Sequence, residues 1–176
     1  MNYNNLRIGS VAFLAALLLN GCGPRRGDRV LQSWETSNQS FKVRIRQFNE
    51  KPMFLPGLPG YYFAFETADH DRPDQWREVA TIRTDDDVKI PREQVRFVND
   101  SIGYFFMGQI YAVTIDGGHL WSVWNAAKER EPEAFIKDVR IDQDGTGEMS
   151  FYPNPKQGTQ PANLFTNDYG QHWQPK

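Results

Sequence analysis

The octet Thr114-Ile-Asp-Gly-Gly-His-Leu-Trp121 decides the fold, because its pattern T-x-D-x-G-x-x-W returns as Thr166-Asn-Asp-Tyr-Gly-Gln-His-Trp173. A Thr and an Asp two residues apart can fold their side-chain oxygens back onto the backbone N–H groups of a tight turn. The following Gly supplies the positive φ that such a turn needs. The Trp then falls on the outgoing strand, where its ring can pack beneath the turn. The residues expected to hold these turns are Thr114, Asp116, Gly118, Trp121, Thr166, Asp168, Gly170 and Trp173.

Both octets resemble Asp-boxes, the hairpin motif of bacterial neuraminidase repeats (BNR repeats) and of related β-propeller proteins. The resemblance implies that the Asp stabilises a turn and performs no chemistry. The segment Thr67–Trp76 resembles a decayed, lengthened third copy, in which Asp69 keeps its spacing and Asp71 replaces the glycine. The tryptophans of the three copies are spaced as expected for repeated β units.

The segments around the octets also predict strands and turns. Phe41–Arg46 alternates apolar and basic residues, which indicates a half-buried strand, and Tyr61–Thr67 is a continuous apolar strand. Gln94–Met107 and Lys137–Phe151 each read as strand, polar turn and strand, which is typical of a hairpin. One short helix is expected at Asn125–Glu131, before a proline.

We therefore predict an all-β fold with propeller-like repeats of antiparallel strands, either a partial propeller or sandwich-like. Closed propellers have roughly four to eight blades. The sequence shows three copies, with Trp34 as a candidate remnant of a fourth. Closure is left open.

The N-terminus predicts export and lipidation. Residues 1–21 are expected to be a signal peptide, with Arg7 before the apolar run Ile8–Leu19, which is too short to span a bilayer as a helix. Leu19-Asn-Gly-Cys22 resembles the lipobox of bacterial lipoproteins, which implies a diacylglyceryl-modified (palmitate-bearing) Cys22. Cys22 is the only cysteine, so an intrachain disulfide is excluded. The alternative is an ordinary secretory signal with an incidental cysteine.

Cleavage before Cys22 would leave a lipid-anchored chain, with residues 22–33 as tether and 34–176 as a single β domain. Gly23 follows the cysteine where inner-membrane lipoproteins typically have Asp. The resemblance thus implies a location in the bacterial envelope, at the outer membrane and facing the periplasm. A net charge of −2 does not indicate the basic surface with which proteins bind nucleic acid.

Two stretches are candidates for binding. The Pro- and Gly-rich loop 51–60 carries apolar side chains that either plug the end of a core or bind a partner. They are Met53, Phe54, Leu55 and Leu58. The basic side chains Lys42, Arg44 and Arg46 share one strand face, which is either simply solvated or a binding stripe.

The sequence does not predict an enzyme. Neuraminidases place a substrate-binding arginine in an Arg-Ile-Pro motif, whereas this chain has Lys89-Ile-Pro91, and lysine lacks the planar fork that grips a carboxylate. Asp142–Gly147 could suggest a calcium loop, but such a loop would begin at Arg140, where an acid is needed, and would have Phe151 at its twelfth position, so a hairpin turn is favoured. His70, His119 and His172 lack metal-ligand spacing. We expect no catalytic residue, metal or cofactor.

A lipid-anchored domain of this kind is expected to bind a protein partner. Trp34–Thr36 with Phe41–Arg44, and Asp168–Gly170 with His172-Trp173, resemble segments of the immunity lipoproteins encoded beside type VI secretion lipase effectors. That resemblance implies a periplasmic inhibitor that occludes an incoming phospholipase, which is a secreted toxin.

Two other classes stay open. Phe97–Asn99, Gly103-Tyr104 and Thr114–Trp121 resemble repeats of photosystem II assembly factors, which are lipoprotein propellers, so an assembly or scaffold role is one alternative. A glycan-binding module using Trp124, Tyr61 and Tyr62 is the other.

Overall fold

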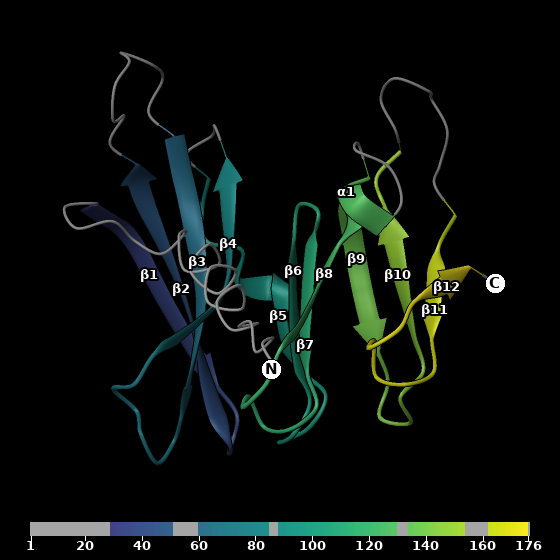
Figure 1. Ribbon diagram of the computed structural model, residues 1–176, viewed down its shortest axis with the longest axis horizontal. Helices are drawn as coiled ribbons and strands as arrows, with labels where there is room; N and C mark the ends of the chain where they lie inside the picture. Colours follow the sequence, from purple (N-terminus) through teal and green to yellow (C-terminus); the bar gives the residue numbers. More distant parts are fainter. Residues whose placement is uncertain (1–28, 51–59, 85–87, 130–133, 154–161, 176) are drawn as a thin grey trace, which may run out of the picture.

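The computed structural model describes residues 29–50, 60–84, 88–129, 134–153 and 162–175, and nearly all of its regular structure is β (Figure 1). The strands are β1 (Arg29–Ser37), β2 (Phe41–Glu50), β3 (Gly60–Asp69), β4 (Arg77–Thr84), β5 (Val95–Phe97), β6 (Gly103–Met107), β7 (Ile110–Thr114), β8 (Ser122–Asn125), β9 (Ile136–Ile141), β10 (Gly147–Phe151), β11 (Leu164–Thr166) and β12 (Gln174–Pro175). The helical pieces are a 3₁₀ turn, η1 (Arg92–Gln94), and the four-residue α1 (Ala126–Glu129).

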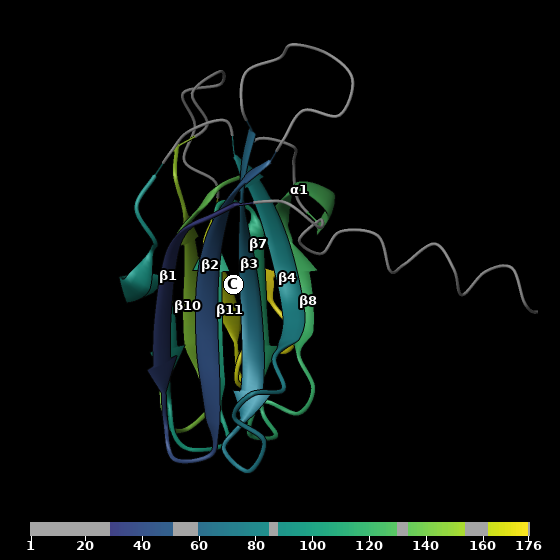
Figure 2. The ribbon, with the colours of Figure 1, turned by 90° about the vertical axis from the view of Figure 1, so that its left-hand side faces the viewer.

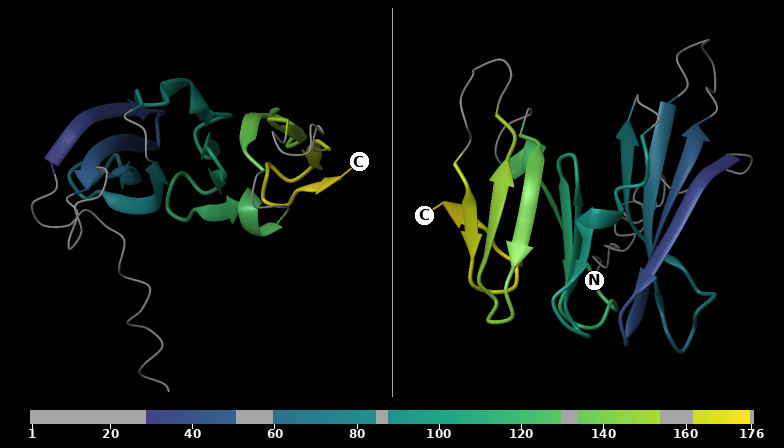
Figure 3. Two further views of the ribbon diagram at one scale, coloured as in Figure 1. Left: turned by 90° about the horizontal axis from the view of Figure 1, so that it is seen from above. Right: turned by 180° about the vertical axis from the view of Figure 1, so that it is seen from behind.

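Three four-stranded antiparallel sheets are built from strands that are consecutive in sequence. The first sheet holds β1–β4, the second β5–β8 and the third β9–β12, and each strand pairs with its sequence neighbour. The sheets stand in a row, with the second between the other two (Figure 1, Figure 3). The predicted all-β fold with repeated antiparallel units is confirmed, and each copy of the pattern corresponds to one sheet. The first and third sheets lie at opposite ends of the row.

Hydrophobic periodicity explains which faces are buried. In β2, Phe41, Val43 and Ile45 are fully buried against the second sheet, whereas the intervening basic side chains point to the opposite face. The strands β6 and β7 lie in the middle of the molecule and are apolar on both faces, as expected for strands covered on both sides.

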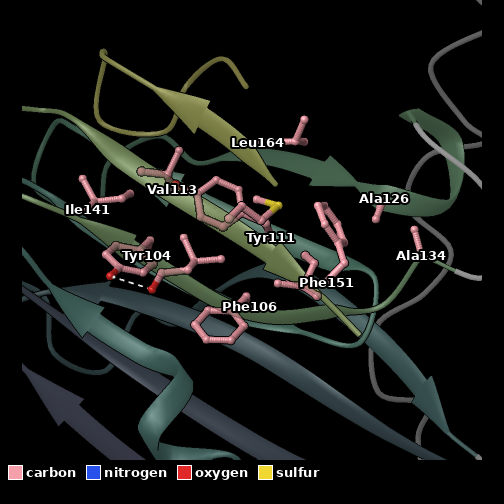
Figure 4. Close-up of a cluster of buried hydrophobic side chains, with 12 residues drawn as sticks. Tyr104, Phe106, Tyr111, Val113, Ala126, Ala134, Ile141, Phe151 and Leu164 are labelled. Carbon is pink, nitrogen blue, oxygen red and sulfur yellow. Dashed lines mark hydrogen bonds between the residues drawn. The ribbon is translucent and has the colours of Figure 1, made fainter. Parts of the chain in front are cut away.

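Two cores join the sheets. The first lies between the first and second sheets, where Phe65 stacks on Phe105 with ring centroids 4.0 Å apart. The second lies between the second and third sheets and is drawn in Figure 4. In this second core, the Tyr104 hydroxyl donates a hydrogen bond of 3.3 Å to the Val139 carbonyl oxygen (Figure 4). The middle sheet therefore shares a core with each neighbour.

The domain starts earlier than predicted. Residues from Arg29 onward pair with β2 as far as Asn49, so the tether predicted for 22–33 ends before Arg29. The correction has a simple cause: β2 is long, and its backbone hydrogen-bonding groups need a partner strand over their whole length. Trp34 belongs to this strand and packs on the first core, so it does not mark a fourth repeat among the described strands.

The predicted hairpins are confirmed as the pairs β5–β6 and β9–β10, and the predicted helix appears as α1, directly after Asn125. Within the described ranges, no helix has the length and apolarity needed to cross a membrane. The predicted signal peptide, Cys22 and the loop residues Met53, Phe54, Leu55 and Leu58 lie outside the described residues.

Candidate functional site

The two octets fold into the same hydrogen-bonded turn. Thr114 Oγ1 donates to Asp116 Oδ1 (2.8 Å) and accepts from the Gly118 backbone N–H (3.0 Å), while Asp116 Oδ1 accepts from the Leu120 N–H (3.0 Å). The second octet repeats these bonds at 2.7, 3.0 and 3.1 Å through its own Thr and Asp. Gly118 and Gly170 have φ of 86° and 81°. The predicted geometry is confirmed, except that each Trp lies just before the outgoing strand.

Each octet also packs on an aromatic ring of the preceding sheet. A Cβ on Gly118 would lie 2.7 Å from the ring of Phe41, which belongs to the first sheet. A Cβ on Gly170 would overlap the hydroxyl of Tyr111, which belongs to the second sheet. Trp121 and Trp173 pack edge-on against these same two rings. The octets therefore join neighbouring sheets as well as closing hairpins.

Hydrogen bonding keeps both octet carboxylates ionised. Burial acts to raise the pKa of Asp116, but the bonds from the Leu120 N–H and the Thr114 hydroxyl outweigh it, so its pKa lies below the ordinary value. Burial also acts to raise the pKa of Asp168, but the hydrogen bonds from Thr166 and His172 outweigh it, so the pKa of Asp168 is lowered too. These carboxylates are turn-forming acceptors rather than proton donors at neutral pH.

The predicted third copy of the pattern does not form such a turn. The Thr67 hydroxyl donates to the Lys42 carbonyl oxygen rather than to Asp69. Asp69 instead pairs with Arg72 and Arg77, each at 3.2 Å. Because the segment is longer than an octet, Asp69 is not part of a tight turn. Arg77 also contacts the octet of the second sheet, where it donates to the carbonyl oxygens of Gly118 (2.9 Å) and His119 (2.8 Å).

The three histidines do not converge. His70 Nε2 lies 2.7 Å from the Asn38 carbonyl oxygen, His119 Nδ1 lies 3.5 Å from Asp69, and His172 Nδ1 lies 2.6 Å from Asp168 Oδ2. Among the described residues no group of His, Cys, Asp and Glu is arranged to hold a metal ion.

The segment Asp142–Gly147 forms the hairpin turn predicted for it. Its Asp144 carboxylate accepts from the backbone N–H and hydroxyl of Thr146. The carboxylate is thus committed to the turn itself.

The aromatics proposed for glycan stacking do not form one platform. Trp124 packs on the core between the second and third sheets. Tyr61 and Tyr62 belong to β3 in the first sheet, where neighbouring side chains alternate between faces. Tyr62 is only 4% exposed.

The most developed side-chain cluster lies on the face of the first sheet that points away from the second sheet, called here the outer face. Figure 2 looks onto it, with the other two sheets behind. The register of β1 to β4 places these side chains on it: Ser33, Glu35, Ser37, Lys42, Arg44, Arg46, Phe48, Tyr62, Ala64, Glu66, Ala68, Glu78, Thr81 and Arg83. Trp76, just before β4, lies over Arg44.

Cations and rings alternate across this outer face. Arg44 Nε donates to Glu66 Oε2 at 2.9 Å, and Arg46 binds both oxygens of Glu66 through Nε and Nη2. The Arg44 guanidinium lies 4.1 Å from the Trp76 ring centroid, and that of Arg46 lies 4.9 Å from the Phe48 ring. Both distances suit a cation–π contact.

This arrangement fixes charged groups that ordinarily move freely. Phe48 stacks in parallel on Tyr62 with ring centroids 4.8 Å apart, which continues the row of side chains. The Glu66 side chain is 7% exposed, and those of Arg44 and Arg46 are 18% and 24% exposed. The interpretation of this basic face as simply solvated is therefore wrong, because the acid and the rings hold the arginines against the sheet.

Sequence reasoning missed this cluster, although it left a trace in the sequence. The carboxylate of Glu66 interrupts an otherwise apolar strand, and the basic strand directly precedes it in the chain. A lone acid in the strand that pairs with a basic strand indicates a cross-strand ion pair. The octet spacing would put the Trp of the third copy at position 74, and Trp76 comes two residues later, which indicates that it packs elsewhere.

Comparison of the chain with protein-family models, with curated proteins and with solved structures found no match.

Proposed function

We propose that this chain is a non-enzymatic envelope lipoprotein that binds a protein partner, and that it acts as an immunity protein against a secreted toxin reaching the periplasm. The observation that carries the proposal is the outer face of the first sheet. Arginine and large aromatic side chains dominate binding energy at protein interfaces, above all where they are held rigid before binding. Arg44 and Arg46 are of this kind and are held by Glu66, and Trp76 lies against the Arg44 guanidinium.

The contacts of the two octets indicate that their Thr, Asp and Gly residues have a structural role. The threonines and aspartates of both octets are hydrogen-bonded within their turns, and their glycines rest on rings of the neighbouring sheet. We therefore propose that function resides on a surface of the molecule rather than in the turns themselves. The lipid anchor at Cys22 and the outer-membrane location are parts of the same proposal.

The test uses the full chain, expressed with its N-terminus in a Gram-negative host, extracted in mild detergent and incubated with an extract of the native organism. The expected result is stoichiometric capture of one secreted hydrolase, whose purified activity falls when the chain is added. Capture of envelope-assembly components, or of a hydrolase whose activity is unchanged, would contradict the immunity proposal.

Two variants separate the two candidate surfaces. Arg44→Ala with Arg46→Ala removes the guanidiniums of the outer face, and Phe54→Asp with Leu55→Asp changes the loop proposed from composition. We expect the first pair to abolish capture. Lys137→Ala, an exposed cation of the third sheet, is the matched control and should capture as the unmodified chain does.

A further inference from the structure

We infer that the outer face of the first sheet recognises a carboxylate of its protein partner, on an acidic segment that lies across β2 and β3 and binds Arg44 and Arg46. This inference rests on the proposed binding function and adds to it the contact site and the chemistry of the partner segment.

The argument begins with the charge balance of the cluster. Glu66 is the one acid ion-paired with Arg44 or Arg46 among the described residues, although Glu35, opposite Arg44 on β1, and Glu78, opposite Glu66 on β4, lie on the same face. Lys42 lies on the same strand face. The pair therefore keeps one excess positive charge that is partly removed from water, and a second carboxylate is the group that best complements it.

The donors of the arginines point to the same conclusion. A guanidinium has five N–H donors in a planar fork. Glu66 accepts from Nε of Arg44 and from Nε and Nη2 of Arg46. Further donors on both side chains remain to bind an incoming acid, and each guanidinium plane is already fixed by a ring, so little entropy is lost on binding.

The flanking rings define what surrounds that carboxylate. Trp76 lies beside Arg44 at one side of the pair, and Phe48 and Tyr62 lie beside Arg46 at the other. A segment in which acidic and apolar side chains alternate would place an acid over the guanidiniums and apolar groups beside the rings. An extended strand has that period of two.

The test compares two fluorescein-labelled peptides, acetyl-Leu-Glu-Leu-Glu-Leu-amide and its counterpart with Gln in place of Glu, by fluorescence anisotropy with the full chain in detergent. We expect the Glu peptide to bind at least about tenfold more tightly than the Gln peptide, since only the former offers a charge-assisted acceptor. This comparison needs no altered protein and so does not depend on how a variant folds.

Three variants then locate the site. Arg44→Lys and Arg46→Lys keep the charge but lose the planar fork, so each should weaken binding of the Glu peptide by about fivefold or more. The control is Arg140→Lys, because Arg140 is an exposed arginine paired with Asp138 on the third sheet, and it should leave binding unchanged.

Equal binding of the two peptides, no binding of either, or an equal loss in Arg140→Lys would overturn the inference. So would displacement of the Glu peptide by inorganic phosphate at a concentration far below that needed with acetate, which would assign the site to phosphate groups. These outcomes are independent of the capture experiment. Failure of the peptide with successful capture of a hydrolase would refute only the contact site, and the reverse result would refute only the immunity function.

Discussion

At the scale of single residues, the octet glycines are held both by backbone conformation and by a neighbouring ring. Gly170→Ala would meet the Tyr111 hydroxyl at φ 81°, whereas Gly108→Ala would meet nothing within 4 Å at φ 59°. We expect a loss of about 1 kcal/mol in the free energy of unfolding for Gly108→Ala, from conformation alone. Gly170→Ala should lose about 3 kcal/mol, because overpacking is added. Urea denaturation measures both, and equal losses would contradict the assigned contact.

The octet carboxylates predict a defined response to acid. The folded-state pKa values of Asp116 and Asp168 are lowered, so their stabilising contribution is complete above the unfolded pKa of about 3.9 and is lost as the pH falls through the folded value. Asp116→Asn combined with Asp168→Asn should therefore destabilise the chain at pH 7, and its stability should converge with that of the unmodified chain as the pH falls through the lowered pKa values of the folded state. Thermal unfolding across this pH range gives the answer. A difference that stays constant with pH would show that the charges contribute nothing.

Removing either carboxylate altogether should be more damaging. Asp116→Ala leaves the Leu120 N–H and the Thr114 hydroxyl without their acceptor, which should cost about 1–2 kcal/mol of unfolding free energy. Thermal unfolding at neutral pH measures the loss, with peptide binding as the second readout. Because the octet is assigned a structural role, residual folded protein should still bind the Glu peptide. Full stability combined with lost binding would instead assign the octet to function.

At the scale of elements, the first sheet is held together by a partly buried ion cluster across β2 and β3. Glu66→Gln would leave two mostly buried guanidiniums without a carboxylate, and we expect a loss of about 2–4 kcal/mol in urea denaturation. Glu78→Gln on β4 is the matched control, since that side chain is exposed and accepts from Thr81. The control should change stability by less than about 0.5 kcal/mol. A similar small effect for Glu66→Gln would show that the cluster contributes little to the sheet.

The sequence predicts the strands and turns well, but it predicts poorly the contacts between residues that are distant in the chain. The alternation in β2, the continuous apolar β3 and the two octets follow from local periodicity and turn chemistry, so their strands and turns were predictable. Phe41 under Gly118, and Arg44 over Trp76, join residues that are distant in the chain. Such contacts depend on register and sheet order, which the sequence does not state. The candidate site was missed for this reason, because its charges look solvated until the register pairs them with Glu66.

At the scale of the whole molecule, the two cores predict one cooperative unit. Phe105→Ala opens the core between the first and second sheets, and Phe151→Ala opens the core between the second and third. Each should cost about 3–5 kcal/mol and shift a single transition seen alike by circular dichroism and tryptophan fluorescence. Two separable transitions in either variant would show that a terminal sheet unfolds on its own.

The most direct test of the account is a growth competition in the native organism. Cells lacking the gene are mixed with wild-type neighbours and complemented with the unmodified chain, with Arg44→Ala and Arg46→Ala together, or with Lys137→Ala. The account predicts that the unprotected cells are lost from the mixture, that the unmodified chain and Lys137→Ala restore them, and that the double arginine variant does not. Equal survival of cells with and without the gene would contradict the proposal that this chain protects its host by binding an incoming toxin.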